Sequence, residues 1–85
     1  MVEQFAAACS NVATVLAKAD AKPEHLVSVT IFTTDLGAYR DNLDGLGEAW
    51  RTAFGRHYPA VALIGVSELF EPEAVVEVVA TAVVP

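Results

Sequence analysis

AVVEVVATAVV, residues 74–84, is the segment that decides the fold. Its small and β-branched apolar residues are typical of a strand. The even positions are apolar, as expected for a sheet face packed under helices, and they are Val76, Val78, Ala80, Ala82 and Val84. The odd positions are also mostly apolar, and they are Val75, Glu77, Val79, Thr81 and Val83. A sheet with helices on one face normally exposes the other to water, so we expect something to cover this second face.

Two further strands are predicted upstream of this segment. Residues 26–33, LVSVTIFT, are rich in β-branched residues and alternate in polarity as strands do. Residues 60–66, AVALIGV, form the next apolar run, and a loop containing Glu71 and Pro72 separates it from residues 74–84. We therefore expect the last two strands to form a hairpin.

Two helices are predicted from apolar residues at helical spacing. The first covers residues 3–20 and should end before Pro23, which lacks a backbone donor. The second runs from Asp35, a plausible N-cap, to Phe54, with Gly55 placed to end it. Glycines weaken this second helix over residues 44–47, where a break would fall. Tyr39, Trp50 and Phe54 are expected to pack in the core.

The element order is therefore αβαββ in a single domain of residues 1–85. Helices that alternate with strands predict an α+β fold with one mixed sheet and both helices on one face. The first two strands should be parallel and joined by a right-handed crossover. An 85-residue chain with 54% hydrophobic residues is apolar for its size, so we expect part of its surface to be an interface between copies of the chain.

The charge and the cysteine content narrow the classes of partner and cofactor. Eleven acidic and five basic residues give a net charge of −6, which disfavours nucleic acid. The single cysteine, Cys9, cannot form an internal disulfide, and no Cys/His spacing predicts a zinc site, so no metal or other cofactor is expected. No apolar run is long enough to span a membrane, and the N-terminus does not resemble a signal peptide. A cytoplasmic location is the default expectation.

Three segments carry a resemblance to a known family. They are VTIFTTDL at 29–36, EAWRTAFGRHYPA at 48–60 and VALIGVSELFEPEAVVEVVATAVV at 61–84. In order and spacing they resemble the YjgF/RidA family of reactive-intermediate deaminases, and the match runs over essentially the whole chain. The resemblance implies a chorismate-mutase-like fold and a homotrimer assembled through its sheets, with a small-molecule pocket at each subunit interface. Family members normally begin with a further β-hairpin and strand, which are absent from these 85 residues.

The resemblance also assigns roles to single positions. Active deaminases of the family carry an arginine after the Pro-Ala dipeptide, which binds the substrate carboxylate, and here that position is Val61. A frequent family cysteine corresponds to Leu63, and an asparagine of the second helix corresponds to Gly47. The glutamate that helps position the hydrolytic water matches Glu77, so one of four polar pocket positions is retained.

Two functions follow from this pattern and stay open at the level of sequence. The first is hydrolysis of an enamine or imine by Glu77 acting on water, with a non-standard substrate because Val61 replaces the arginine. The second is a non-catalytic, trimeric protein that binds a small ligand or has a regulatory role. Ribonuclease activity or translation inhibition, attached to some family members, has little support in an acidic chain without a basic patch. The expected pocket is mostly apolar, favouring a neutral, cationic or larger apolar ligand, and its residues are Val61, Leu63, Gly65, Val75, Val79, Tyr58 and Arg56, with Glu77.

The remaining polar candidates each have a simpler structural explanation. Arg56 could contact an anion in place of the family arginine, but basic residues such as Arg56 and His57 also commonly follow a helix C-terminus. His25 is expected to lie at the surface. Cys9 lies on the apolar stripe of the first helix and is expected to behave as a small hydrophobic residue.

Overall fold

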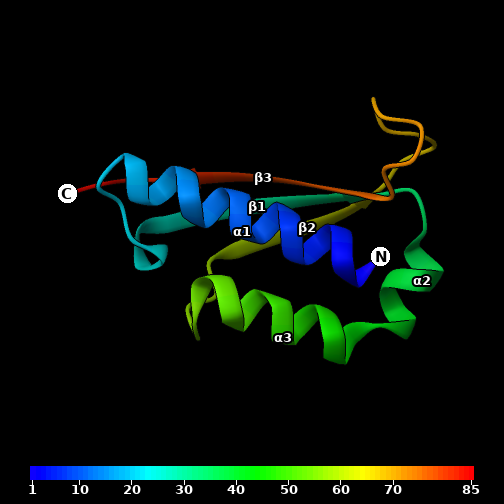
Figure 1. The fold of residues 1–85 in the computed structure, drawn as a ribbon, viewed down its shortest axis with the longest axis horizontal. Coiled ribbons are helices and arrows are strands. Elements are labelled where there is room, and N and C mark those ends of the chain that lie inside the picture. Colours follow the sequence, from blue (N-terminus) through cyan, green and yellow to red (C-terminus); the bar gives the residue numbers. More distant parts are fainter.

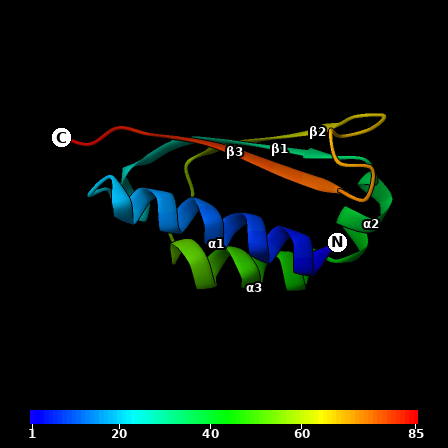
Figure 2. The same cartoon turned by 45° about the horizontal axis from the view of Figure 1, so that its top comes forward.

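The computed structural model describes all 85 residues as two long helices beneath a three-stranded sheet (Figure 1). In chain order the elements are α1 (Val2–Lys18), a 3-10 turn η1 (Pro23–His25), β1 (Leu26–Thr33), α2 (Leu36–Asp41), α3 (Leu43–Phe54), β2 (Ala60–Gly65) and β3 (Val76–Ala82). Both long helices lie on the same side of the sheet (Figure 2). The predicted α+β fold with a mixed sheet and helices on one face is confirmed.

The strands are arranged in the order β2-β1-β3. β1 pairs with β2 in parallel, as predicted, and with β3 in antiparallel orientation. The predicted hairpin between the last two strands is therefore wrong, because β1 lies between them. The connection over residues 66–75 is longer than the two to five residues typical of hairpin loops, and it carries the chain across β1 to the far edge.

The register assigns the paired residues of β1 from Ser28 onward, and their partners, to one of two faces. Val29 lies opposite both Val61 and Ala80, and Ile31 lies opposite both Leu63 and Val78, so these residues share the face toward the helices. The core lies between this face and the helices. Its buried apolar residues are Phe5, Cys9, Leu16, Ala21, Leu26, Val29, Ile31, Leu46, Trp50, Phe54 and Val76. The other face carries Ser28, Thr30, Phe32, Ala60, Ala62, Ile64, Glu77, Val79 and Thr81, and we call it the outer face.

The predicted second helix is two helices, and the break falls at Asn42 instead of within residues 44–47. The Asn42 side chain donates to the Ala38 carbonyl at 2.7 Å, which competes with continuation of the helix. Gly45 is tolerated inside α3 because α1 passes close to it: a Cβ at this position would lie 3.1 Å from a methyl carbon of Val2. Gly55 ends α3 as predicted, with a positive φ of 69°.

A network of hydrogen bonds around Val75 fixes the start of β3. Its carbonyl accepts from the Thr33 hydroxyl at 2.8 Å and from the Thr34 amide at 3.1 Å. Its amide donates to the side chain of Gln4 in α1 at 2.8 Å. The Thr33 hydroxyl also accepts from the Asp35 amide at 3.1 Å, just before α2. One buried hydroxyl thus links the end of β1, the entry to α2 and the start of β3.

Replacing Thr33 with valine tests this network. The substitution keeps the shape of a side chain that is 0% exposed but leaves the Val75 carbonyl and the Asp35 amide each without one partner. Thr33→Val should lower the free energy of unfolding by about 1 to 3 kcal/mol in urea denaturation at fixed protein concentration. Thr52→Val is the control, because Thr52 is exposed and bonds only within α3, and it should change stability by less than about 0.5 kcal/mol. Equal effects of the two substitutions would contradict this role for Thr33.

Candidate functional site

An apolar cleft of about 220 Å³ opens between α3 and the edge strand β2, and we call it the α3–β2 cleft. α3 contributes one face of its helix, with residues at positions 43, 46, 47 and 50, and β2 contributes Val61. Its lining residues are Phe5, Ile31, Tyr39, Leu43, Leu46, Gly47, Trp50, Tyr58 and Val61. No carboxylate, histidine, lysine or arginine belongs to this lining, so the cleft offers shape and apolar surface instead of charge.

Aromatic stacking builds one wall of the cleft. The Tyr58 ring stacks on Trp50 with centroids 6.2 Å apart and planes inclined by 13°. The Trp50 indole donates to the His57 carbonyl at 3.0 Å, and Nε2 of His57 bonds to the Leu26 carbonyl at 2.9 Å. These bonds hold the segment between α3 and β2 in place. Tyr58 is itself 62% exposed, so part of its ring is available to a ligand.

Several sequence-predicted pocket residues meet on the side of the sheet toward the helices. Val61 and Tyr58 line the cleft, and so does Gly47, the position to which the sequence resemblance assigns the family asparagine. Leu63 and Gly65 follow Val61 on the same face of β2 but lie outside the cleft lining. Gly65 is exposed, but Leu36 of α2 approaches it closely, since a Cβ there would lie 2.8 Å from a methyl carbon of Leu36.

Glu77 and Val79 are not brought together with these residues within one chain. They lie opposite Phe32 and Thr30 of β1, which places them on the outer face, whereas Val61 shares the helix-facing side. The predicted pocket is thus divided between the two faces of the sheet. The alternation of polarity along residues 74–84 predicted the two faces of β3 correctly. The error was to treat β2 and β3 as neighbours, because β1 lies between them and Val61 and Glu77 fall on opposite faces of the sheet.

The other polar candidates lie away from the cleft. Arg56 is exposed just after α3 and belongs to no cleft lining. His25 accepts a hydrogen bond from the Lys22 amide at 3.0 Å in the η1 turn. Cys9 is buried in the core, and burial raises the pKa of its thiol to about 11. Burial, followed by the nearby Cys9, also raises the pKa of Tyr39. The structure contains no cluster of three or more metal-ligating side chains.

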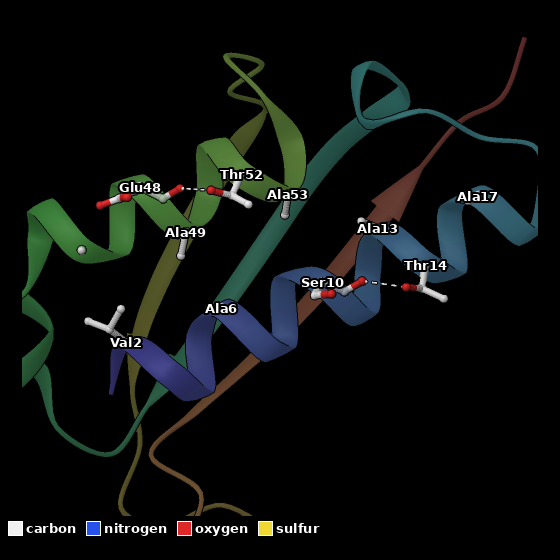
Figure 3. A pocket seen from close by; sticks show the side chains of 11 residues that line it. Val2, Ala6, Ser10, Ala13, Thr14, Ala17, Glu48, Ala49, Thr52 and Ala53 are labelled. Carbon is white, nitrogen blue, oxygen red and sulfur yellow. Dashed lines mark hydrogen bonds between the residues drawn. The ribbon is translucent and has the colours of Figure 1, made fainter.

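A larger hollow of about 600 Å³ lies between α1 and α3 (Figure 3). Sequence reasoning missed it, because its alanine, serine and threonine residues are also typical of a solvent-facing helix surface. Two of its hydroxyls are engaged within their own helices: Thr14 donates to the Ser10 carbonyl and Thr52 to the Glu48 carbonyl, each at 3.0 Å. Glu48 is its only ionisable side chain, so no acid–base pair or nucleophile is assembled there.

Comparison with known proteins identifies the family. The model of the family described as endoribonuclease L-PSP matches residues 1–84. The chain belongs to this family. A solved L-PSP-type protein from Entamoeba histolytica is 26% identical, with a TM-score of 0.82 over 99% of this chain and 63% of its own. A member of the YjgF/YER057c/UK114 family from Mycobacterium tuberculosis is 30% identical, with a TM-score of 0.71 over 86% of this chain and 58% of its own.

A third similar structure carries the Rid name. It is a Rid-family protein of unknown function from Yersinia pestis, 29% identical, with a TM-score of 0.70 over 87% of this chain and 56% of its own. A comparison with curated protein sequences gives no significant match. The L-PSP membership confirms the resemblance drawn from the sequence. The 85 residues span about three fifths of the length of these solved proteins. In this chain, no helix is long and apolar enough to cross a membrane.

The burial of Cys9 predicts a thiol that does not react in the folded L-PSP domain. Raising its pKa from 9.0 to about 11 lowers the thiolate fraction near pH 8 about a hundredfold. A thiol-reactive chromogen should therefore label Cys9 only after urea unfolds the chain. Because the folded-state pKa is raised, the stability contributed by the protonated thiol is complete below about pH 9 and is lost as the pH rises through about 11. Rapid labelling without denaturant would contradict the burial of Cys9.

Proposed function

We propose that this L-PSP-family chain binds a small molecule in the α3–β2 cleft without hydrolysing it. The observation that supports this function is the composition of the cleft lining, which is apolar and aromatic and contains no general acid or base apart from two tyrosine hydroxyls. Proton transfer in a hydrolytic step needs a group with a pKa near the working pH within hydrogen-bonding reach of the substrate. The burial that raises the pKa of Tyr39 takes it further from that range.

The size of the cleft favours a small ligand. Its volume of about 220 Å³ is below the roughly 300 Å³ at which pockets for drug-sized molecules begin. A single ring fits this space and can stack on Tyr58, which is already held parallel to Trp50. Contact with Val61 and Leu43 adds apolar area, and these two side chains are 49% and 59% exposed in the chain alone. Burial of this exposed apolar surface is the driving force for binding.

A second candidate function is hydrolysis of an imine or enamine, and the position of Glu77 favours it. Glu77 is the only carboxylate on the outer face, where its neighbours across and along the sheet are Phe32 and Val79. If a second copy covers this face, the Glu77 carboxylate is enclosed among apolar side chains at the interface, where it can hold a water molecule against a substrate. The substrate would be one without a carboxylate at the position where Val61 replaces the family arginine.

We also propose that the outer face joins copies of the chain into a homotrimer. Ile64 and Val79 on this face are 43% and 51% exposed, and aliphatic residues of neighbouring strands extend the patch. A symmetric assembly removes such a surface from water on every copy at once. In this arrangement Glu77 lies at the subunit interface, where groups of a neighbouring copy face it.

A fluorine-labelled probe tests ligand binding in the cleft. Para-fluorobenzyl alcohol should bind the wild-type chain and broaden in fluorine NMR, since its ring fits the space beside Tyr58. Val61→Phe fills the cleft and should weaken binding at least roughly tenfold, because the ligand loses its place in the lining. Leu63→Phe is the matched control, since Leu63 lies on the same face of β2 but outside the lining, and it should leave binding nearly unchanged.

Equal binding by the Val61 and Leu63 variants would place the probe elsewhere and overturn the assignment of the cleft.

Ammonia release from a panel of carboxylate-free imines tests the second candidate function, hydrolysis by Glu77. The wild-type chain should release none above the uncatalysed rate. Turnover that disappears in Glu77→Gln would establish hydrolysis and remove the non-catalytic function.

The native mass tests the assembly through the outer face. Light scattering over a range of concentrations should give about 27 kDa, three times the chain mass of 9.0 kDa. Ile64→Lys places a charge in the proposed interface and should shift the mass toward the monomer. Leu43→Lys, an exposed apolar position on α3, should leave the mass unchanged. A wild-type monomer at all concentrations would contradict the proposed trimer.

A further inference from the structure

The guanidinium of Arg51 lies against Gly47 at the edge of the α3–β2 cleft. A Cβ built on Gly47 would come within 3.2 Å of a terminal nitrogen of Arg51 and 3.9 Å of the guanidinium carbon. Gly47 lines the cleft, and the two residues are one helical turn apart on α3. Long helical side chains point back toward the N-terminus, which brings Arg51 over position 47. The absence of a side chain at Gly47 is what leaves room for the guanidinium there.

The Arg51 guanidinium takes part in none of the side-chain hydrogen bonds of the structure. The acidic residue nearest to Arg51 along α3 is Glu48, which lines the hollow toward α1 on another side of the helix (Figure 3). Arg51 is also solvent-exposed, so its donors are free to bind a ligand. A guanidinium that makes no hydrogen bond within the chain and lies beside an uncharged cleft is the feature to be explained.

We propose that Arg51 binds the anionic group of the ligand whose apolar part occupies the α3–β2 cleft, an inference that rests on the ligand-binding function proposed above. The ligand is then a small ring or short apolar body that carries a carboxylate. The apolar part contacts Tyr58 and Val61, and the carboxylate lies outside the lining at the Gly47 edge. This revises the expectation, drawn from the sequence, of a neutral, cationic or larger apolar ligand.

The chemistry of arginine suits this position. A planar guanidinium binds a carboxylate through two parallel hydrogen bonds, which fixes the direction of the ligand as well as its charge. An anion at the edge of the cleft keeps part of its hydration, so it avoids the desolvation that a carboxylate buried beside Val61 would suffer. Arg56, the anion contact considered from the sequence, lies beyond Gly55 and outside the lining, so it serves as a comparison.

Three probes of similar shape and different charge test the proposal. Benzoate, benzamide and benzylamine share a ring that fits the cleft, and their affinities for the wild-type chain are measured by calorimetry or by ligand-observed NMR. Benzoate should bind most tightly, and its advantage over benzamide should shrink as salt is added. Arg51→Gln should weaken benzoate binding roughly fivefold and leave benzamide binding unchanged. Arg51→Lys should retain part of the preference, because it keeps the charge but loses the planar fork.

Arg40→Gln and Arg56→Gln are the matched controls, since both arginines are exposed and, unlike Arg51, neither guanidinium lies against Gly47 of the cleft lining. Neither substitution should change the preference for benzoate. A preference that survives Arg51→Gln, or that disappears in Arg56→Gln, would overturn the role of Arg51. If benzoate and benzamide bind equally and Val61→Phe blocks both, the cleft binds ligands but the anion contact is wrong. If no probe binds the wild-type chain, the proposed function and this inference fall together.

Discussion

The contact between Thr33 and Val75 is the constraint on which the remaining structure depends. β1 ends at Thr33, and its buried hydroxyl binds the residue that precedes β3 while accepting from the residue that precedes α2. Gln4 joins α1 to the same point through two hydrogen bonds of its side-chain amide, to Val75 and to Glu73. Because side chains alternate along a strand, a shift of one residue at this point would move Glu77 to the helix side and Val76 to the outer face. The hydrogen bonds around Thr33 and Val75 therefore fix which side chains of β3 lie on the helix side of the sheet and which lie on the outer face.

The consequence is a molecule with two distinct apolar surfaces. The helix-facing side of β2 is incompletely covered, since α3 leaves Val61 accessible, and the α3–β2 cleft results. The outer face has no helix over it and carries Glu77 among apolar neighbours. The two surfaces lie on opposite sides of a single sheet layer, so a ligand in the cleft of one copy cannot contact Glu77 of the same copy. The proposed ligand binding and any chemistry of Glu77 can therefore be tested separately.

The features that depend on local periodicity, such as the faces of a strand, could be predicted from the sequence. The features that depend on long-range pairing, such as the order of the strands, could not. The alternation of residues 74–84 assigned Val76, Val78 and Ala80 to the helix face, and the register confirms this. Gly55 ended the helix where its conformational freedom indicated. Periodicity carries no information about which strand lies beside which. The predicted hairpin was therefore wrong, and the predicted pocket combined residues of β2 and β3 that β1 separates. The break at Asn42 escaped detection because no glycine or proline lies there, and the side-chain hydrogen bond from Asn42 to the Ala38 carbonyl is visible only in the structure.

Two positions for which the resemblance implies a larger polar residue border the same space. Glycine at position 47 and valine at position 61 both line the α3–β2 cleft, so both leave volume there. A longer side chain at 47 would collide with the Arg51 guanidinium in its present place, and an arginine at 61 would occupy the cleft and bring a second positive charge toward the first. The two small residues therefore decide the shape of the cleft as well as its polarity. They leave an apolar space between α3 and β2, and the Arg51 guanidinium at its Gly47 edge is the charge on which the proposed ligand contact rests.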